Sequence, residues 1–265
     1  MTYLSNNNKI SFFDVKSFKK VRAREISKHN KQLIFNNNER LLSIGEWYIK
    51  KKTLLKKEAS VYKNVVVGCQ LNNDEGSVHV IELKKEKNER DLIKVGNLYT
   101  WRTNGPVFAV QQLRNANTLV YSSGNTLYTR KYICDRKSID PPKKQYICGS
   151  LIVGITIKDS STIIVSTRST SVSVFEYNRK TGELVNVYND SVSKSLLNSI
   201  GVNDFMVISD KLHSTITGFK VDKAGDFAPK FKDTVGGVVR LKNCELVPIW
   251  VNDVYYDIVK QHNRF

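Results

Sequence analysis

Short runs of alternating apolar and polar residues dominate the chain and predict β-strands. The runs are rich in β-branched and aromatic residues and are bounded by Gly, Asn, Asp or Ser, as strands between turns are. They predict strands at Lys9–Val15, Val65–Cys69, Ser77–Leu83, Val107–Leu113, Thr118–Ser122, Thr126–Tyr132, Ile152–Ile157, Thr162–Ser166, Val172–Tyr177 and Asp204–Ser209. Helical periodicity is weak, and the best candidates, Asn38–Tyr48 and Asn252–Asn263, lack good caps. The fold class is therefore all-β.

The predicted strands recur in a fixed order. From Gly105, Leu151 and Asn198 the chain runs through strand, polar gap, strand, turn and strand, and a looser unit precedes them. These starts lie roughly 45 residues apart, which is the period of four-stranded propeller blades. A single blade leaves both faces unburied, and stacking against its neighbours completes the core. We therefore predict a WD40-like β-propeller of four-stranded blades, complete or incomplete, although the WD and GH signatures of ordinary arrays are missing.

The same pattern divides the chain into three parts. Residues 1–60 hold a predicted N-terminal strand pair and a basic linker, and residues 61–240 hold the blades. Residues 241–265 form a C-terminal segment for which a helix is one interpretation. No apolar run approaches the roughly 18 residues that span a bilayer, and the N-terminus lacks a secretory pattern, so we expect no membrane association.

The chain carries a formal net charge of +17. Such an excess indicates an anionic partner, nucleic acid or an acidic protein surface, unless it is spread thinly over solvated faces. Basic residues cluster between apolar runs, where we expect hairpin loops or strand edges, and lysines there also protect sheets from pairing with other chains. The candidate contacts to an anionic partner are Lys19, Lys20, Arg22, Arg24, Lys50, Lys51, Lys52, Lys56 and Lys57.

The segment WYIKKK has two interpretations. Trp47 and Tyr48 beside Lys50–Lys52 combine aromatic rings with cations, as single-stranded nucleic-acid binding requires. Alternatively, the segment is a strand whose aromatic residues face the core while its lysines face water.

Residues of catalytic or metal-binding type show no familiar spacing. The four cysteines form no CxxC pair, which argues against a zinc site and a disulfide scaffold, and Cys69 and Cys244 are expected to be buried. His79 fits a hydrogen-bonded strand histidine better than a metal ligand. GxSxG, P-loop and GxGxxG motifs are missing. We therefore expect no enzymatic activity and no cofactor.

The order of these patterns resembles the last propeller of the CPSF-A family. That family includes the damaged-DNA-binding protein large subunit, a yeast cullin adaptor of the methyl-methanesulfonate-sensitivity class, and large subunits of the cleavage and polyadenylation factor and splicing factor 3b. The resemblance covers Lys9 to Val239 and departs at Cys69 and Ser166, where the family has Thr and Asp. The matching segments are Val66–Cys69, Gly76–Leu83, Gly105–Val107, Leu119–Tyr128, Ile163–Tyr177 and Phe205–Phe219.

The resemblance implies a non-enzymatic scaffold. Its partners would be subunits of a cullin-RING ubiquitin ligase acting in DNA repair, in the nucleus or, as the alternative, the cytoplasm. A second hypothesis is a scaffold of a pre-mRNA splicing or 3′-end-processing complex that contacts RNA. An enzyme built on a propeller is the third, and it lacks an acid–base constellation.

Overall fold

The computed structural model of the chain contains four sheets of blade type. It describes residues 2–5, 9–13, 20–25, 38–51, 60–72, 74–85, 92–113, 117–133, 138–190, 193–202, 205–210, 215–221, 227–234, 240–241 and 244–245. Every regular element in these ranges is a strand. Accordingly, the described residues include no helix that is long and apolar enough to cross a membrane.

Each blade is an antiparallel meander in which consecutive strands pair. Blade 1 consists of β4 (Glu39–Lys51), β5 (Ser60–Leu71), β6 (Gly76–Lys85) and β7 (Leu92–Thr103). Blade 2 consists of β8 (Val110–Gln112), β9 (Thr118–Ser123), β10 (Thr126–Ile133) and β12 (Lys143–Ile147), with β11 (Ser138–Ile139) also paired to β10. Blade 3 consists of β13 (Ile152–Ile157), β14 (Thr162–Thr167), β15 (Val172–Asn178) and β16 (Glu183–Asn189). Blade 4 consists of β17 (Leu196–Val202), β18 (Phe205–Asp210), β19 (Thr215–Val221) and β20 (Phe227–Thr234).

Three N-terminal strands extend blade 1 at its outer edge. They are β1 (Thr2–Ser5), β2 (Lys9–Phe13) and β3 (Lys20–Glu25), and β3 pairs in parallel with β7. The result is a seven-stranded sheet in the order β1-β2-β3-β7-β6-β5-β4. Its last strand, β4, pairs with β5 along its length, so one sheet spans the boundary expected between residues 60 and 61. A separate hairpin of β21 (Arg240–Leu241) and β22 (Cys244–Glu245) lies near the other end of the chain.

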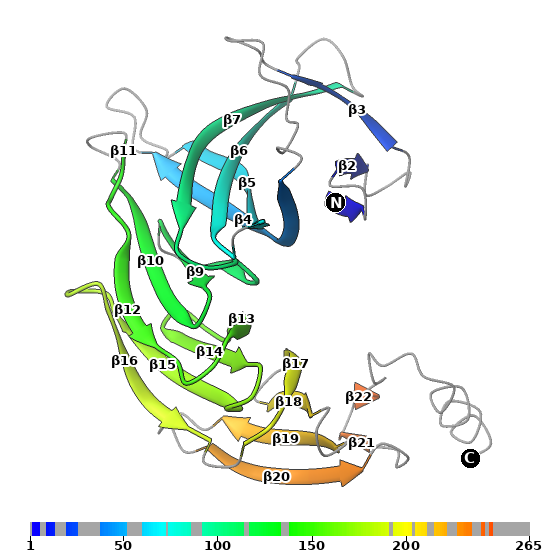
Figure 1. The fold of residues 1–265 in the computed structure, drawn as a ribbon, viewed down its shortest axis with the longest axis vertical. Coiled ribbons are helices and arrows are strands. Elements are labelled where there is room, and N and C mark those ends of the chain that lie inside the picture. The colour runs from blue at the N-terminus through cyan, green and yellow to red at the C-terminus, as the bar shows by residue number, and fades with distance from the viewer. Residues whose placement is uncertain are drawn as a thin grey trace.

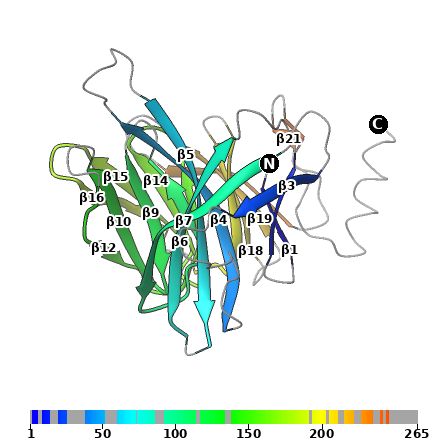
Figure 2. The same cartoon turned by 90° about the horizontal axis from the view of Figure 1, so that it is seen from above.

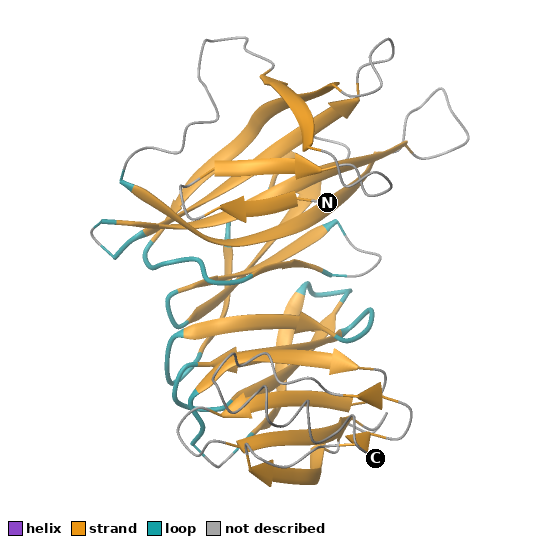
Figure 3. Ribbon diagram, turned by 90° about the vertical axis from the view of Figure 1, so that its right-hand side faces the viewer, coloured by secondary structure: helices purple, strands orange, loops and turns teal. Residues whose placement is uncertain are grey.

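The sheets follow one another around an arc. Figure 1 shows blades 1 to 4 side by side along this arc, with β1–β3 at one end and β21–β22 at the other. The side view shows the same sheets stacked in succession (Figure 3), and the view from above shows blade 1 in front of blades 2 and 3 (Figure 2). This arrangement is that of propeller blades, and the described sheets leave the ring open.

The predicted strands are confirmed, because each overlaps an observed strand. The helix candidate Asn38–Tyr48 is wrong, since Glu39–Lys51 forms β4. Trp47 and Ile49 are buried on this strand while Glu46 and Tyr48 are exposed, which is the alternation of a strand rather than a helix. The other helix candidate, Asn252–Asn263, lies outside the described residues.

The largest hydrophobic cores lie between blades rather than within them. Because blades 2 and 3 pack against neighbours on both faces, central strands such as β14 are buried almost throughout. Ile163 and Val165 of β14 face the core shared with blade 2, whereas Ile164 faces the core shared with blade 4. The cores join Trp47 to Tyr121 between blades 1 and 2, Leu127 to Phe175 between blades 2 and 3, and Val174 to Leu196 between blades 3 and 4.

Backbone hydrogen bonds also connect successive blades. Val107 N donates to Cys69 O at 3.2 Å, which ties the segment before β8 to β5. Gly124, in the turn between β9 and β10, connects blade 2 to blade 3. Its N donates to Pro106 O, before β8, and its O accepts from Ile152 N, at the start of β13. Gly124 has φ +61°, a left-handed conformation that glycine adopts without strain. These bonds set the position of each blade against the next.

Candidate interaction surfaces

The predicted basic residues lie at one end of the seven-stranded sheet, as far as the structure describes them. Lys20, Arg22 and Arg24 are on β3, and Lys50 and Lys51 end β4. We expected loop or sheet-edge positions for all of them, and for β3 this is wrong, because that strand lies between β2 and β7. The remaining candidates, Lys19, Lys52, Lys56 and Lys57, lie outside the described residues.

The register shows that these strands meet at the same end of the sheet. Lys50 and Lys51, at the end of β4, pair with the first residues of β5. Lys84 and Lys85 are the last residues of β6, and they pair with residues near the start of β7. The start of β7 pairs in turn with β3. These basic residues are far apart in the sequence, and strand pairing places them at the same end of the sheet.

The two aromatic residues of WYIKKK have different environments. Trp47 is fully buried between blades 1 and 2, so its ring belongs to the core. Tyr48 is 37% exposed, its hydroxyl donates to Glu46 at 2.5 Å, and Lys63 Nζ lies 5.4 Å from its ring centre. Lys63 also forms an ion pair with Glu46 at 2.6 Å. The interpretation as a strand with a core-facing aromatic residue therefore holds for Trp47, whereas Tyr48 faces outward.

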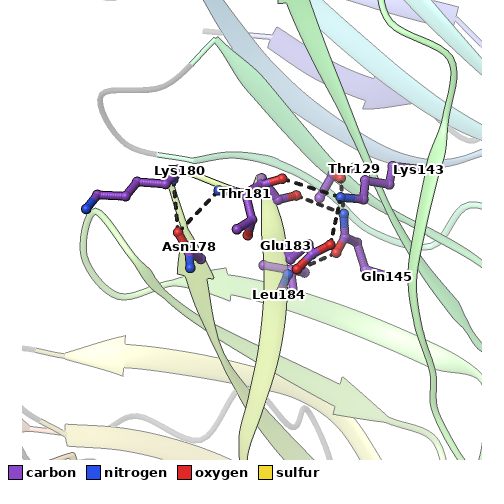
Figure 4. Close-up of polar contacts among 9 residues, drawn as sticks. Thr129, Lys143, Gln145, Asn178, Lys180, Thr181, Glu183 and Leu184 are labelled. Atoms are coloured by element: carbon purple, nitrogen blue, oxygen red, sulfur yellow. Dashed lines mark hydrogen bonds and ion pairs between the residues drawn. The ribbon is translucent and has the colours of Figure 1, made fainter.

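A side-chain amide joins the outer strands of blades 2 and 3 (Figure 4). Gln145 Oε1 accepts from Leu184 N at 2.9 Å, and its Nε2 donates to Gly182 O at 3.2 Å and to Thr129 Oγ1 at 2.6 Å. The amide thus pairs with the edge of β16 much as a strand residue would. Lys143 adds an exposed ion pair with Glu183 at 3.4 Å. These contacts hold the two outer strands in one arrangement.

The outer strands β12 and β16, here called the outer rim, expose apolar side chains. Ile147, Val185 and Val187 are 53%, 54% and 40% exposed. Beside them, the side-chain amides of Asn186 and Asn189 exchange hydrogen bonds at 3.1 and 2.8 Å. Exposed cations flank the outer rim at Lys143, Lys144, Arg179 and Lys180.

The sequence did not reveal this rim. Neither of its strands is among those predicted from the sequence, because β12 is short and mostly polar and β16 does not alternate between apolar and polar residues. Exposure of a valine depends on which strand is outermost in the sheet. The available signal was the β-branched and aromatic content of β16, which favours a strand.

A buried polar cluster lies on the face of blade 1 opposite blade 2. His79 Nε2 lies 3.0 Å from Glu39 Oε1 and 3.1 Å from Ser77 Oγ, while His79 Nδ1 lies 3.1 Å from Thr100 Oγ1. In a catalytic triad the serine and the carboxylate contact opposite ring nitrogens. Here both contact Nε2, so the geometry is that of a hydrogen-bonded strand histidine, as predicted for His79.

Two thiols are buried in the cores. Burial, with a smaller contribution from Glu39, raises the pKa of Cys69 to about 12, and burial raises the pKa of Cys148 to about 12. Both are free thiols, and the burial predicted for Cys69 is confirmed. The side chain of Cys244 lies outside the described part of the chain. Within that part, no group of three or more His, Cys, Asp or Glu residues is placed to hold a metal ion.

Comparisons with known proteins leave the resemblance to the CPSF-A family a prediction. No protein-family model matches the chain, and no curated protein matches its sequence. The propeller-type arrangement of the blades therefore rests on the structure itself.

Proposed function

We propose that the chain is a protein-interaction scaffold that binds partners through side chains on the outer rim. The carrying observation is the exposure of Ile147, Val185 and Val187 on strands that are fixed to each other by Gln145. Exposed apolar side chains with flanking charges are a common composition of protein interfaces, and a rigid surface loses little entropy on binding. The flanking cations favour a partner with an acidic surface.

Within this proposal, the chain is the propeller portion of a cullin-RING ubiquitin ligase adaptor acting in DNA repair in the nucleus. The order of sequence patterns that resembles the CPSF-A family supports this proposal. The mechanism is proximity: the scaffold holds other proteins near each other and performs no bond chemistry. A scaffold of a splicing or 3′-end-processing complex is the second candidate, which the net charge of +17 favours because RNA is anionic.

Affinity capture with a matched variant tests the proposal. The tagged chain would be captured from nuclear extract of its own cells, and the bound proteins would be identified by mass spectrometry. The variant Val185→Glu adds a charge to the rim, and the control Ser169→Glu adds the same charge to an exposed turn. Recovery of a cullin, lost in the first variant and kept in the second, supports the ligase scaffold.

Other outcomes separate the alternatives. Recovery of splicing or cleavage-factor subunits with the same dependence on Val185 supports the RNA-processing scaffold instead. Equal recovery of all partners by Val185→Glu and the unmodified chain would show that the rim is not the binding surface. Thermal unfolding of both variants confirms that they remain folded.

A further inference from the structure

Three basic residues occupy paired positions on three neighbouring strands of the first sheet. Arg24 of β3 pairs with Lys94 of β7, and Lys94 pairs with Lys84 of β6. Paired positions lie on the same face of a sheet, about 4.5–5.5 Å apart. The register therefore forms a row of cations across β3, β7 and β6.

Further basic residues extend the row along β3. Lys20 and Arg22 alternate with Arg24, so they occupy the same face of the strand. Alternate positions are about 6.6 Å apart along a strand, and neighbouring strands are about 4.8 Å apart. Glu82, two residues from Lys84 on β6, is the acidic residue on this face of β6, whereas Glu25 has the opposite alternation on β3. The positive charge of the row thus exceeds this negative charge.

Like charges at directly paired positions destabilise a sheet. A bound anion removes that repulsion, and a polyanion does so at several positions together. The row spans two directions, along β3 and across to β6, so that one extended chain of negative charges can contact several of these residues. A nucleic-acid backbone supplies such a chain, and its binding is strengthened by counterion release.

We propose that Arg24, Lys94 and Lys84, extended by Lys20 and Arg22, bind the phosphate backbone of a nucleic acid. Trp47 is buried and provides no stacking platform. The cations of the row would contact phosphates, which carry no sequence information. The site lies on β3, β7 and β6 of the first sheet, whereas the outer rim lies on β12 and β16, and the proposal does not depend on the scaffold function.

Two variants with equal loss of charge test this site. In the first, Arg24, Lys94 and Lys84 are each changed to Gln. In the control, Lys144, Arg168 and Lys180, which are exposed on blades 2 and 3, are each changed to Gln. Fluorescence anisotropy of a labelled polyuridine oligonucleotide and a labelled DNA duplex gives the affinity at about 50 and 200 mM salt, a range over which phosphate contacts lose much of their strength.

The first variant should bind polyuridine about tenfold or more weakly at low salt, with a salt slope reduced by about two for three lost contacts on a single strand. The control should keep the affinity of the unmodified chain within about threefold, because sites far apart act independently. Equal weakening in both variants would indicate diffuse charge and overturn the proposal. So would the absence of binding of both nucleic acids at low salt.

A second measurement guards against a folding defect in the first variant. Ultraviolet cross-linking of the unmodified chain to polyuridine, followed by peptide mapping, locates the bound segment directly. Cross-links within residues 20–25, 84–85 and 92–94 support the site. Cross-links confined to blades 2 to 4 contradict it, whatever the stability of the variant.

Discussion

Asp159 holds the tight turn between β13 and β14. Its Oδ1 accepts from Ser161 N and Thr162 N, both at 2.8 Å. Partial burial raises the pKa of Asp159, but the hydrogen bonds from Ser161 and Thr162 outweigh it, so the pKa lies below the usual value. The ionised carboxylate therefore stabilises the fold, because it satisfies two backbone donors that the turn leaves without ladder partners.

Replacing this carboxylate should produce a pH-dependent loss of stability. Asp159→Ala should lower the free energy of unfolding by about 1–2 kcal/mol at pH 7, the cost of losing hydrogen bonds to a charged group at a partly exposed site. Because the folded-state pKa is depressed, the stabilisation is present above the unfolded pKa and declines as pH falls through the folded pKa. Urea unfolding at pH 7 and pH 3 should show the difference shrinking, and a constant difference would contradict this account.

The buried thiols should resist alkylation in the folded protein. The thiolate is the reactive form, and a pKa of about 12 leaves almost none of it for Cys69 and Cys148 near neutral pH. Iodoacetamide at pH 8 should modify these two residues only after unfolding in urea, as followed by peptide mass spectrometry. Rapid modification of either residue under native conditions would contradict its burial.

Central strands could be predicted from sequence, and outer strands could not. Strand β14 is apolar on both faces and has a clear pattern, as does β15, where Val172 and Val174 face blade 4 while Phe175 and Tyr177 face blade 2. Outer strands such as β16 bury fewer side chains, and because Val185 and Val187 face outward, the sequence of β16 lacks a clear apolar–polar alternation. Strand β4 was ambiguous because its apolar residues are irregularly spaced around a bulge between Leu41 and Ser43.

The candidate surfaces depend on pairing between distant strands. The basic clusters were visible in the sequence, but their union required β3 to pair with β7, a parallel contact between segments far apart in the chain. No local pattern specifies such a pairing. Predicting the outer rim would have required knowing that β12 and β16 are outermost in their sheets.

Loss of the Gln145 amide should loosen the junction between these outer strands. Gln145→Met has a similar shape but leaves Leu184 N and Gly182 O without this partner, which should cost about 1–2 kcal/mol at this half-buried site. Gln111→Met, at an exposed position on β8, is the control and should change stability by less than about 0.5 kcal/mol. Chemical denaturation measures both values, and equal values would show that the bridge contributes nothing.

Because the largest cores are shared between sheets, the blades stabilise one another. Blade 1 contributes Trp47 and Val66 to a core whose other half comes from blade 2. Gly68 lies where the two blades approach closely, because an added Cβ there would clash with Val107. Beside it, Ser43 Oγ donates to Val107 O at 2.8 Å. An array of this kind gains stability from its interfaces as well as from its individual sheets.

The glycine at this interface gives a direct test of blade packing. In Gly68→Ala, the added Cβ would lie 2.5 Å from Val107 Cγ1 and 2.6 Å from Val107 O, so the backbone of blade 2 must move. Overpacking of this kind costs about 1–3 kcal/mol, which corresponds to a fall in Tm of several degrees for a chain of this size. Gly154→Ala is the matched control, since its Cβ would meet Ser166 Cβ at 3.6 Å, an ordinary contact.

Differential scanning calorimetry of the two variants should separate them, with a clear loss for Gly68→Ala and little change for Gly154→Ala. Hydrogen exchange then locates the effect. Amides on both sides of the interface, in β5 and in the segment from Val107 to β9, should exchange faster in Gly68→Ala, because the bond from Val107 N to Cys69 O crosses it. Faster exchange confined to blade 1 would show that the blades fold independently and that the shared core does not couple them.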